Sequence, residues 1–267
     1  MKIGFIGFGN IAKGITAGLI TKKKDVRIYY YDIQEEVVKN FSFADQIQKT
    51  KTIEELESSA EVVIFSVKPK DMKNVVMECK NPQNQKHYIS VAAGISLSTI
   101  LSWNPKLTQI ARVMPNIATI VQHSVSAIYS QNPETVEIAK TIFDQVGITL
   151  ILNNEEMMHA FTALGGSGPA FVLSFLDGMI EAGIREGFSY ETAYWISLHI
   201  LMGTAKLLLE EYQQNQQFLH PADLKRKITS PAGTTIEGLV SLEKYAIKYA
   251  LIEAVHQATL RSKELGK

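Results

Sequence analysis

The sequence contains very little of what cross-linked or metal-bound proteins use. Cys79 is the only cysteine among 267 residues, so an internal disulfide is excluded and a cysteine-ligated zinc site would lack its partners. The six histidines show neither metal-ligand spacing nor a His-Glu-x-x-His pair. We therefore predict no metal ion, and the scarcity of cysteine favours a reducing, cytoplasmic location.

The sequence also lacks a net charge. Lys and Arg total 27 and Asp and Glu total 27, so no overall field would hold the chain on nucleic acid or on an anionic membrane. An uncharged stretch over residues 160–176 is shorter than the ~20 residues of a bilayer span and is interrupted by glycines and Pro169. We therefore expect neither a nucleic-acid nor a membrane partner, and we predict that this stretch is protein core.

The first half of the chain alternates β-rich apolar runs with helical patterns, which is typical of βαβ units on a parallel sheet. Thr52, with Glu55 three residues later, predicts a helix start at which the two side chains cap each other's backbone amides. Several runs are apolar on both faces, as buried parallel strands are. The expected strands cover residues 2–6, 26–32, 62–67, 87–92, 110–114, 125–129 and 148–152.

The second half is helical, with periodic runs over residues 170–186, 189–212 and 243–264. The run over 189–212 is apolar on more than one stripe, which predicts burial inside a domain or in a subunit interface. We therefore predict an α/β fold with a doubly wound, mostly parallel sheet over residues 1–155 and an all-helical domain over residues 156–267.

A glycine-rich turn follows the first predicted strand and opens a helical pattern. Gly7 permits a tight turn, Gly9 lets the backbone approach a pyrophosphate, and the small Ala12 allows close packing of strand and helix. The second predicted strand ends in Asp32, 23 residues beyond Gly9, where a carboxylate accepts hydrogen bonds from the adenosine ribose. Strand, glycines, helix and acid together predict a dinucleotide site.

Asp32 bears on the choice between NAD and NADP. A carboxylate there repels a 2′-phosphate, and the following Ile33 and Gln34 supply no arginine to hold one, which favours NAD. Two alternatives stay open: Asp32 caps the following turn, or the lysines at positions 22–24 reach a phosphate from the side. Residues 66–69 and 92–94 end two further predicted strands and are expected to line the cofactor, although Lys68 is equally well explained as a solvated loop charge.

Clustered glycines over residues 162–171 predict a break or a close approach in a helical region, because each glycine costs roughly 1 kcal/mol there relative to alanine. Ser167 is not a hydrolase nucleophile, since the segment lies among helices and the required spacing ends in Pro169. The alternative to a functional role is a tight helix crossing. His159 and His199 are interpreted as packing residues.

The segment Ser230-Pro231-Ala232-Gly233-Thr234-Thr235 leads into a helix predicted from about Thr234. Free backbone amides, hydroxyl groups and a helix N-terminus together form an anion nest, which suits a small carboxylate. The alternative is an ordinary Ser-Pro helix start.

Taken together, these residues resemble the Δ1-pyrroline-5-carboxylate reductase family over nearly the whole chain. The resemblance implies a Rossmann domain and a helical dimerisation domain, a homodimer with active sites built between subunits, and in some members rings of dimers. It implies an NAD(P)H-dependent oxidoreductase of the CH–NH group that forms L-proline in proline biosynthesis. The motifs that carry it are Ile6-Gly7-Phe8-Gly9-Asn10, Val67-Lys68-Pro69, Ser90-Val91-Ala92-Ala93-Gly94, Arg112-Val113-Met114-Pro115-Asn116, residues 162–171 and residues 230–236.

The resemblance also implies roles for single residues. Thr235 matches the active-site threonine, and Glu155 matches an acidic residue near the substrate. The substrate segment comprises Ser230, Ala232, Gly233, Thr234 and Thr235. The residues implied to bind NADH or NADPH are Ile6, Gly7, Phe8, Gly9, Asn10, Ile11, Asp32, Ser66, Val67, Lys68, Pro69, Val91, Ala92 and Ala93.

The chain departs from the family pattern at several positions. Gly165 stands for a serine, Phe171 for a tyrosine and Ala232 for a glycine, and Arg226 and His159 stand where aspartate is common. A positive φ at Ala232 would cost roughly 1–2 kcal/mol. These departures bear on substrate affinity. They leave two alternatives open, a related imine or β-hydroxyacid reductase and a non-catalytic dinucleotide-binding paralogue.

Overall fold

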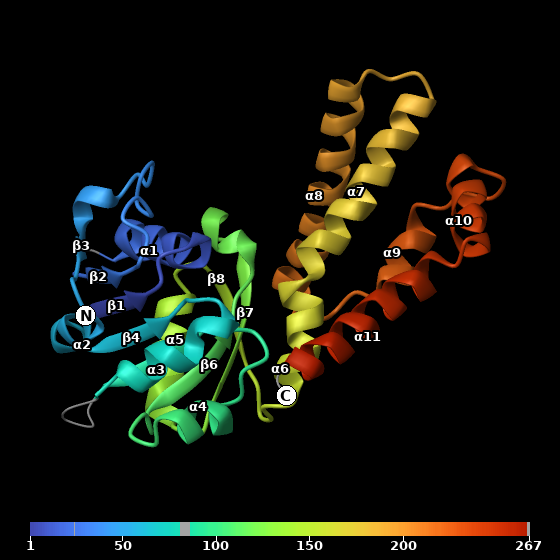
Figure 1. Cartoon of the computed structure of the whole chain (residues 1–267). Helices are drawn as coiled ribbons and strands as arrows, with labels where there is room; N and C mark the ends of the chain where they lie inside the picture. The colour runs from blue at the N-terminus through green and yellow to red at the C-terminus, as the bar shows by residue number, and fades with distance from the viewer. Residues whose placement is uncertain (24, 81–85, 266–267) are drawn as a thin grey trace. The chain divides into compact units, whose positions relative to one another are not determined.

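The computed structural model describes residues 1–23, 25–80 and 86–265. Contacts within the chain divide it into two compact units (Figure 1). The first unit consists of Met1–Pro169 with Val255–Lys267, and the second is Ala170–Ala254. This division describes packing, so the functional boundary expected between residues 155 and 156 stays a prediction.

The first unit is built on an eight-stranded sheet with the order β3-β2-β1-β4-β5-β6-β7-β8. All neighbours are parallel except β6 and β7. The order 3-2-1-4-5-6 is the doubly wound Rossmann arrangement, which confirms the predicted fold class. The strands are β1 (Lys2–Ile6), β2 (Arg27–Tyr31), β3 (Ile47–Lys49), β4 (Val62–Phe65), β5 (His87–Ser90), β6 (Ile110–Met114), β7 (Ser124–Ser130) and β8 (Gly147–Ile151).

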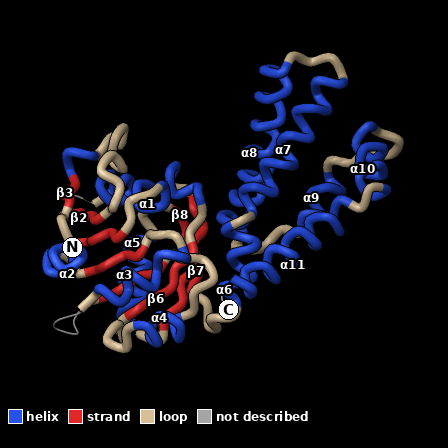
Figure 2. The backbone as a smooth tube through the Cα atoms, viewed as in Figure 1, coloured by secondary structure: helices blue, strands red, loops and turns tan. Residues whose placement is uncertain are grey.

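Helices cover both faces of this sheet (Figure 2). On one face, α1 (Asn10–Lys22) and α5 (Pro133–Phe143) bury an apolar cluster that includes Ile15, Leu19 and Phe143. On the other, α2 (Ile53–Ser59), α3 (Met72–Glu78) and α4 (Leu97–Trp103) pack on a second cluster. This two-sided cover explains why the strands are apolar on both faces.

Several short elements escaped the sequence analysis. The edge strand β3 has only three residues, and the 3-10 turns η1 (Ala44–Gln46), η2 (Pro69–Asp71) and η3 (Ile117–Val121) carry no periodic pattern. The cap of α2 is confirmed in part, because the Thr52 side chain accepts a hydrogen bond from the Glu55 N–H at 3.1 Å. The return bond goes to a different amide, since Glu55 accepts from Lys51 N–H at 2.7 Å.

The helical part of the chain begins with α6 (Met157–Phe161) and a π-helical turn, η4 (Thr162–Gly166). The helices predicted over 170–186 and 189–212 are confirmed as α7 and α8. The single helix predicted over 243–264 is wrong: Ala246, at a φ of 52°, separates α10 from α11. Neither glycine nor proline stands at this break, and the apolar pattern continues through it, so nothing in the sequence pattern indicated it. The helices are α7 (Gly168–Arg185), α8 (Tyr190–Asn215), α9 (Pro221–Lys227), α10 (Thr234–Lys244) and α11 (Ile247–Leu265).

The second unit leaves most of its large apolar side chains exposed. Its described residues form one small buried cluster, Leu176, Ile180 and Ala193. The segments Met157–Arg185 and Tyr190–Asn215 are long and apolar enough to cross a membrane, a test that helices covered by other protein also pass, and little of either is buried. For the helix over 189–212, burial inside its own chain is therefore wrong, and a subunit interface stays a prediction.

Candidate active site

A cavity of about 450 Å³ opens at the carboxyl ends of β1, β2, β4 and β5. Of the residues that the sequence analysis assigned to a cofactor, all but Ile6 and Gly94 line it. Ile6 is fully buried in the second apolar cluster. Ile33, Gln34, Val37 and Asp71 line it as well. Val37 and Asp71 were not singled out from the sequence, although their place just beyond Asp32 and Pro69 was a usable signal.

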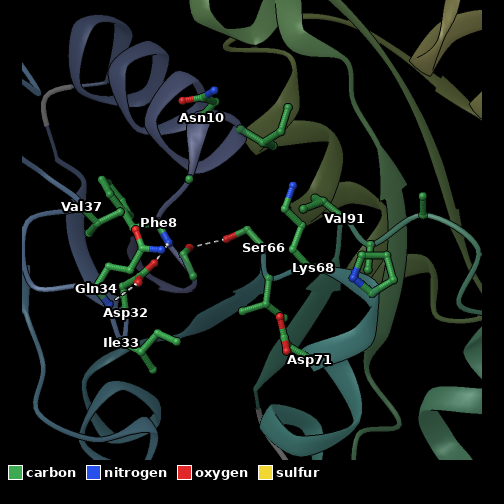
Figure 3. Close-up of a pocket in the computed structure, with 17 residues that line it drawn as sticks. Phe8, Asn10, Asp32, Ile33, Gln34, Val37, Ser66, Lys68, Asp71 and Val91 are labelled. Atoms are coloured by element: carbon green, nitrogen blue, oxygen red, sulfur yellow. Dashed lines mark hydrogen bonds between the residues drawn. The ribbon is translucent and has the colours of Figure 1, made fainter.

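The first wall of this cavity is the glycine turn after β1. Gly7 has a φ of +86°, and a Cβ there would come within 2.9 Å of the Ser66 backbone and 2.8 Å of the Val67 side chain. The Ser66 hydroxyl also donates to the Gly7 carbonyl at 2.6 Å (Figure 3). A residue with a side chain would therefore clash at Gly7, which confirms the tight turn predicted there.

The N-terminus of α1 is open to a ligand. Gly9 is the residue before the helix, no side chain among the described residues caps it, and a Cβ built there would meet nothing within 4 Å. The first backbone N–H groups of a helix point outward and favour an anion. This part of the cavity therefore fits a pyrophosphate.

Asp32 lies on the wall opposite to Lys68. Its Oδ2 accepts a hydrogen bond from the Phe8 N–H at 2.7 Å and its Oδ1 from the Gln34 N–H at 2.8 Å. The alternative reading, in which Asp32 caps the following turn, is therefore correct for one oxygen. Figure 3 draws Lys68 beside Val91, on the far side of Ser66 from Asp32. Asp32 and Lys68 thus lie on different sides of the cavity, and Asp71, a second carboxylate in its lining, lies on the side of Lys68.

The loop after β5 forms the remaining wall with Val91, Ala92 and Ala93. Gly94 has a φ of +81°, and a Cβ there would lie 3.1 to 3.3 Å from atoms of Leu265 at the end of α11. The end of α11 therefore packs directly on the loop that lines the cavity, and the positive φ at Gly94 favours glycine at this position.

A partly buried ion pair supports the same loop. Arg112 on β6 donates to Glu155 Oε1 at 2.8 Å, and the same oxygen accepts from the Leu97 N–H, at the start of α4, at 2.7 Å. Sequence reasoning assigned Glu155 to the substrate, a role that stays a prediction. What the geometry adds is that its carboxylate ties β6 to the beginning of α4.

His159 lies in the neighbourhood of this pair. Its Nδ1 is 3.0 Å from the Ser262 hydroxyl, and its pKa is lowered from the ordinary value, first by burial and then by the charge of Arg112. This environment agrees with its interpretation as a packing residue. His199, interpreted in the same way, is exposed on α8 and contacts the Trp195 ring.

The predicted break in residues 162–171 is confirmed as the π-helical turn η4. Gly166 faces β6, since a Cβ there would lie 2.8 Å from the Met114 side chain, and Asn116 donates to the Gly165 carbonyl at 3.0 Å. The close approach to β6 therefore explains the glycine at position 166. Among the described residues no group of three His, Cys, Asp or Glu side chains is placed to hold a metal ion.

The predicted anion nest lies in the second unit. Gly233 precedes α10 without a side-chain cap, and its N–H donates to the Ser230 carbonyl at 3.2 Å. Ala232 has a φ of 58°, so the strained conformation considered for it is present. Thr235 is half-buried in the first turn of α10. Hydroxyl groups and a helix N-terminus therefore lie together there, as expected for binding a carboxylate.

Comparisons with known proteins cover the whole chain. A family model described as pyrroline-5-carboxylate reductase dimerisation matches residues 155–265, and one described as NADP oxidoreductase coenzyme F420-dependent matches residues 2–94. The chain is 36% identical to the pyrroline-5-carboxylate reductase of Methanosarcina acetivorans, over 100% of this chain and 98% of that one. It is 35% identical to that of Aquifex aeolicus, over 99% and 97%.

Solved structures agree. The pyrroline carboxylate reductase of Plasmodium falciparum with NADP bound superposes with a TM-score of 0.87 at 27% identity, covering 100% of this chain and 98% of that chain. The pyrroline-5-carboxylate reductase of Coxiella burnetii gives 0.88 at 28% identity, covering 99% and 98%. A prephenate dehydrogenase from Aquifex aeolicus, at 10% identity and 0.55, shares the fold alone.

Proposed function

The chain belongs to the pyrroline-5-carboxylate reductase family, and from this premise we propose that it transfers hydride from NAD(P)H to the imine carbon of 1-pyrroline-5-carboxylate, forming L-proline in proline biosynthesis. The observation that carries the proposal is the full-length match to reductases of this name. The open α1 N-terminus and the 230–235 segment, as structural features, support it independently.

The first unit holds the dinucleotide in this proposal. The N-terminus of α1 at Gly9 binds the pyrophosphate, Asp32 binds the adenosine ribose, and the loop of Val91, Ala92 and Ala93 lies beside the nicotinamide. The cofactor supplies the hydride when bound, and the protein positions it. Lys68, at the end of the cavity opposite to Asp32, adds a positive charge that suits a phosphate oxygen.

The second unit binds and protonates the substrate. Backbone amides and hydroxyls of residues 230–235 hold the carboxylate, and Thr235 orients the imine nitrogen. An imine accepts hydride more readily once its nitrogen carries a proton. A threonine hydroxyl is too weak an acid to supply that proton unaided, so Thr235 acts by orienting a water molecule that delivers it.

The same proposal includes the assembly and location of the protein. The chain carries a dimerisation domain, so it associates with other copies, and we propose a homodimer, with larger rings of dimers as a further step. The exposed apolar residues of α7 and α8 supply the surface for this contact. The cytoplasm is the proposed location, because the only cysteine has no partner for a disulfide.

The test is oxidation of NADH and NADPH by the purified chain, with and without 1-pyrroline-5-carboxylate, followed by mass identification of the product. We expect substrate-dependent oxidation that yields proline. Thr235→Ala is expected to lower kcat by about 100-fold with NADH binding intact, which is within the usual range for a group that assists proton transfer. Thr235→Ser keeps the hydroxyl and serves as the matched control.

Each remaining outcome points to a named alternative. Reduction of another cyclic imine by NAD(P)H, or oxidation of a β-hydroxyacid by NAD(P)+, would replace the substrate and keep nicotinamide-dependent hydride transfer as the reaction class. Dinucleotide binding without reduction of any of these compounds would indicate a non-catalytic paralogue. Unchanged turnover of Thr235→Ala would remove Thr235 from the mechanism.

A further inference from the structure

The adenosine-ribose end of the cavity carries a fixed negative charge. We infer that this charge selects NADH over NADPH, which differs from NADH by a phosphate on the 2′-oxygen of that ribose. The inference rests on the proposed function for the class of cofactor. It separates this chain from the NADP that is named in the matching family model and in the Plasmodium structure.

Two backbone amides hold the Asp32 carboxylate in place, one on each oxygen (Figure 3). One donor, Phe8, belongs to the glycine turn, and the other, Gln34, belongs to the loop after β2. Because both bonds would break if the carboxylate rotated away, it cannot readily make room for a second anion. Each oxygen keeps lone-pair capacity, which the two ribose hydroxyls of NADH can use.

Few cations are placed to offset a 2′-phosphate at this end. Among the described residues that line the cavity, Lys68 is the single cation, and it lies on the other side of Ser66 from Asp32. Lys22 is the last residue of α1 and Lys23 follows it, so both lie at the far end of the helix, roughly 20 Å from its N-terminus. Lys22 also donates to the Gln145 carbonyl at 2.6 Å. Lys24 lies outside the described residues.

The loop beyond β2 adds negative charge rather than positive. Ile33 is 85% exposed and lines the cavity with Gln34, so an alkyl and an amide group occupy positions where an arginine would hold a phosphate. Glu35 and Glu36 follow directly, and the next lysine, Lys39, forms an ion pair with Glu36 at 3.0 Å. The charge around the 2′-oxygen therefore favours a ribose with free hydroxyls.

The preference is measurable as a ratio of dissociation constants. Like charges a few ångströms apart near a protein surface repel strongly enough that we expect Kd for NADPH to exceed Kd for NADH by about 10-fold to 100-fold. Salt screens an exposed repulsion, so the ratio should shrink as ionic strength rises. Calorimetric titration of the full chain with each dinucleotide, without any imine, gives both constants at low and at high salt.

Two variants test whether Asp32 is the cause. Asp32→Asn removes the charge, so Kd for NADPH should fall, Kd for NADH should rise, and their ratio should approach one. Gln34→Arg leaves Asp32 and its bond to the Phe8 amide untouched and supplies a cation, so it should tighten NADPH binding by about 10-fold. Glu35→Gln, which removes an exposed charge that does not line the cavity, is the matched control and should lower the ratio by no more than about twofold.

The inference is overturned if the wild-type chain binds NADPH as tightly as NADH, if it binds neither, or if both Asp32→Asn and Gln34→Arg bind the dinucleotides in the wild-type ratio. Binding of neither dinucleotide would also overturn the proposed function, whereas the other outcomes are separable from its failure. Selective NADH binding without proline formation would contradict the proposed substrate but keep the inferred selectivity for NADH. Proline formation with NADPH preferred would do the opposite.

Discussion

The two units of this chain use apolar residues in opposite ways. In the first, the large apolar side chains Phe5, Phe65 and Phe143 are fully buried between sheet and helices. In the second, Trp195 is 58% exposed and Leu209 is 62% exposed, although both lie on long, regular helices. The first unit therefore supplies its own core, whereas the helices of the second present apolar surface that a single chain does not cover.

This difference assigns different sources of stability to the two units. Burial of apolar surface drives folding, and the first unit achieves it within one chain. Exposed apolar patches of this extent mark surfaces that contact other protein, in line with the match of residues 155–265 to a dimerisation domain. The stability of the second unit should therefore depend on protein concentration, while that of the first should not.

The largest expected effect comes from placing charge on the exposed apolar helix. Met202→Glu combined with Leu209→Glu would bury unpaired carboxylates in a subunit contact on α8, so we expect monomers and loss of imine reduction. Because the cofactor cavity lies within the first unit, NADH should still bind. Sedimentation and NADH titration measure the two properties separately.

The control for this variant is Gln213→Glu, which adds a carboxylate at an exposed polar position of the same helix and should leave association unchanged. A double variant that still associates with the affinity of the wild-type chain would show that α8 does not form the contact. One that also loses NADH binding would show that the first unit depends on association.

Ion pairs also differ between the two units, being more buried in the first than in the second. We expect a smaller effect from removing one of them than from placing charge on α8. Arg112 and Glu155 pair in the first unit with side chains 5% and 24% exposed, whereas Lys206 and Glu210 on α8 are 72% and 50% exposed. Arg112→Ala leaves a largely buried carboxylate without its cation and should cost about 3–5 kcal/mol of unfolding free energy. Lys206→Ala, the matched control, should cost about 0.5 kcal/mol or less.

Denaturant unfolding measures both costs. The double variant Arg112→Ala/Glu155→Ala should be more stable than Arg112→Ala alone, because no buried charge is left unpaired. Equal losses of unfolding free energy in Arg112→Ala and Lys206→Ala would contradict this difference between the units. Since Glu155 also holds the Leu97 amide at the end of the cavity-lining loop, NADH affinity should weaken in Glu155→Ala as well.

The sequence predicted those parts of the fold that repeat a local pattern. Strands with continuous apolar runs, the glycine turn at Gly7 and the acid at Asp32 are all specified by residues close in sequence, and they were located correctly. By contrast, β3 has three residues and owes its pairing to β2, and the break at Ala246 needs a left-handed residue that no glycine announces. Tertiary context decides both.

The candidate site likewise contains residues that the sequence located and a contact that it did not. Residues on the strand ends lie together because parallel strands share one edge, so one rule located nearly the whole cavity. The pairing of Glu155 with Arg112 joins residues 43 positions apart, and no periodicity connects them. The family resemblance implied a substrate contact for Glu155, which stays a prediction, and its partners in the structure are an arginine and a backbone amide.

The smallest expected effect is a pH dependence confined to the first unit. Burial, and then the charge of Arg112, lower the pKa of His159 in the folded chain. Lys263 acts in the same direction, and Glu156 opposes it. Burial also lowers the pKa of His87, against the opposing charge of Glu134. These two histidines therefore bind protons more readily in the unfolded chain than in the folded one, so stability should fall as pH drops below about 6.5, and their contribution should be flat above it. His159→Gln should reduce this fall, whereas His199→Gln, at an exposed position of the second unit, should leave it unchanged. Unfolding free energies measured from neutral to mildly acidic pH decide the point, and a fall of equal size in wild type and His159→Gln would place the titrating group elsewhere.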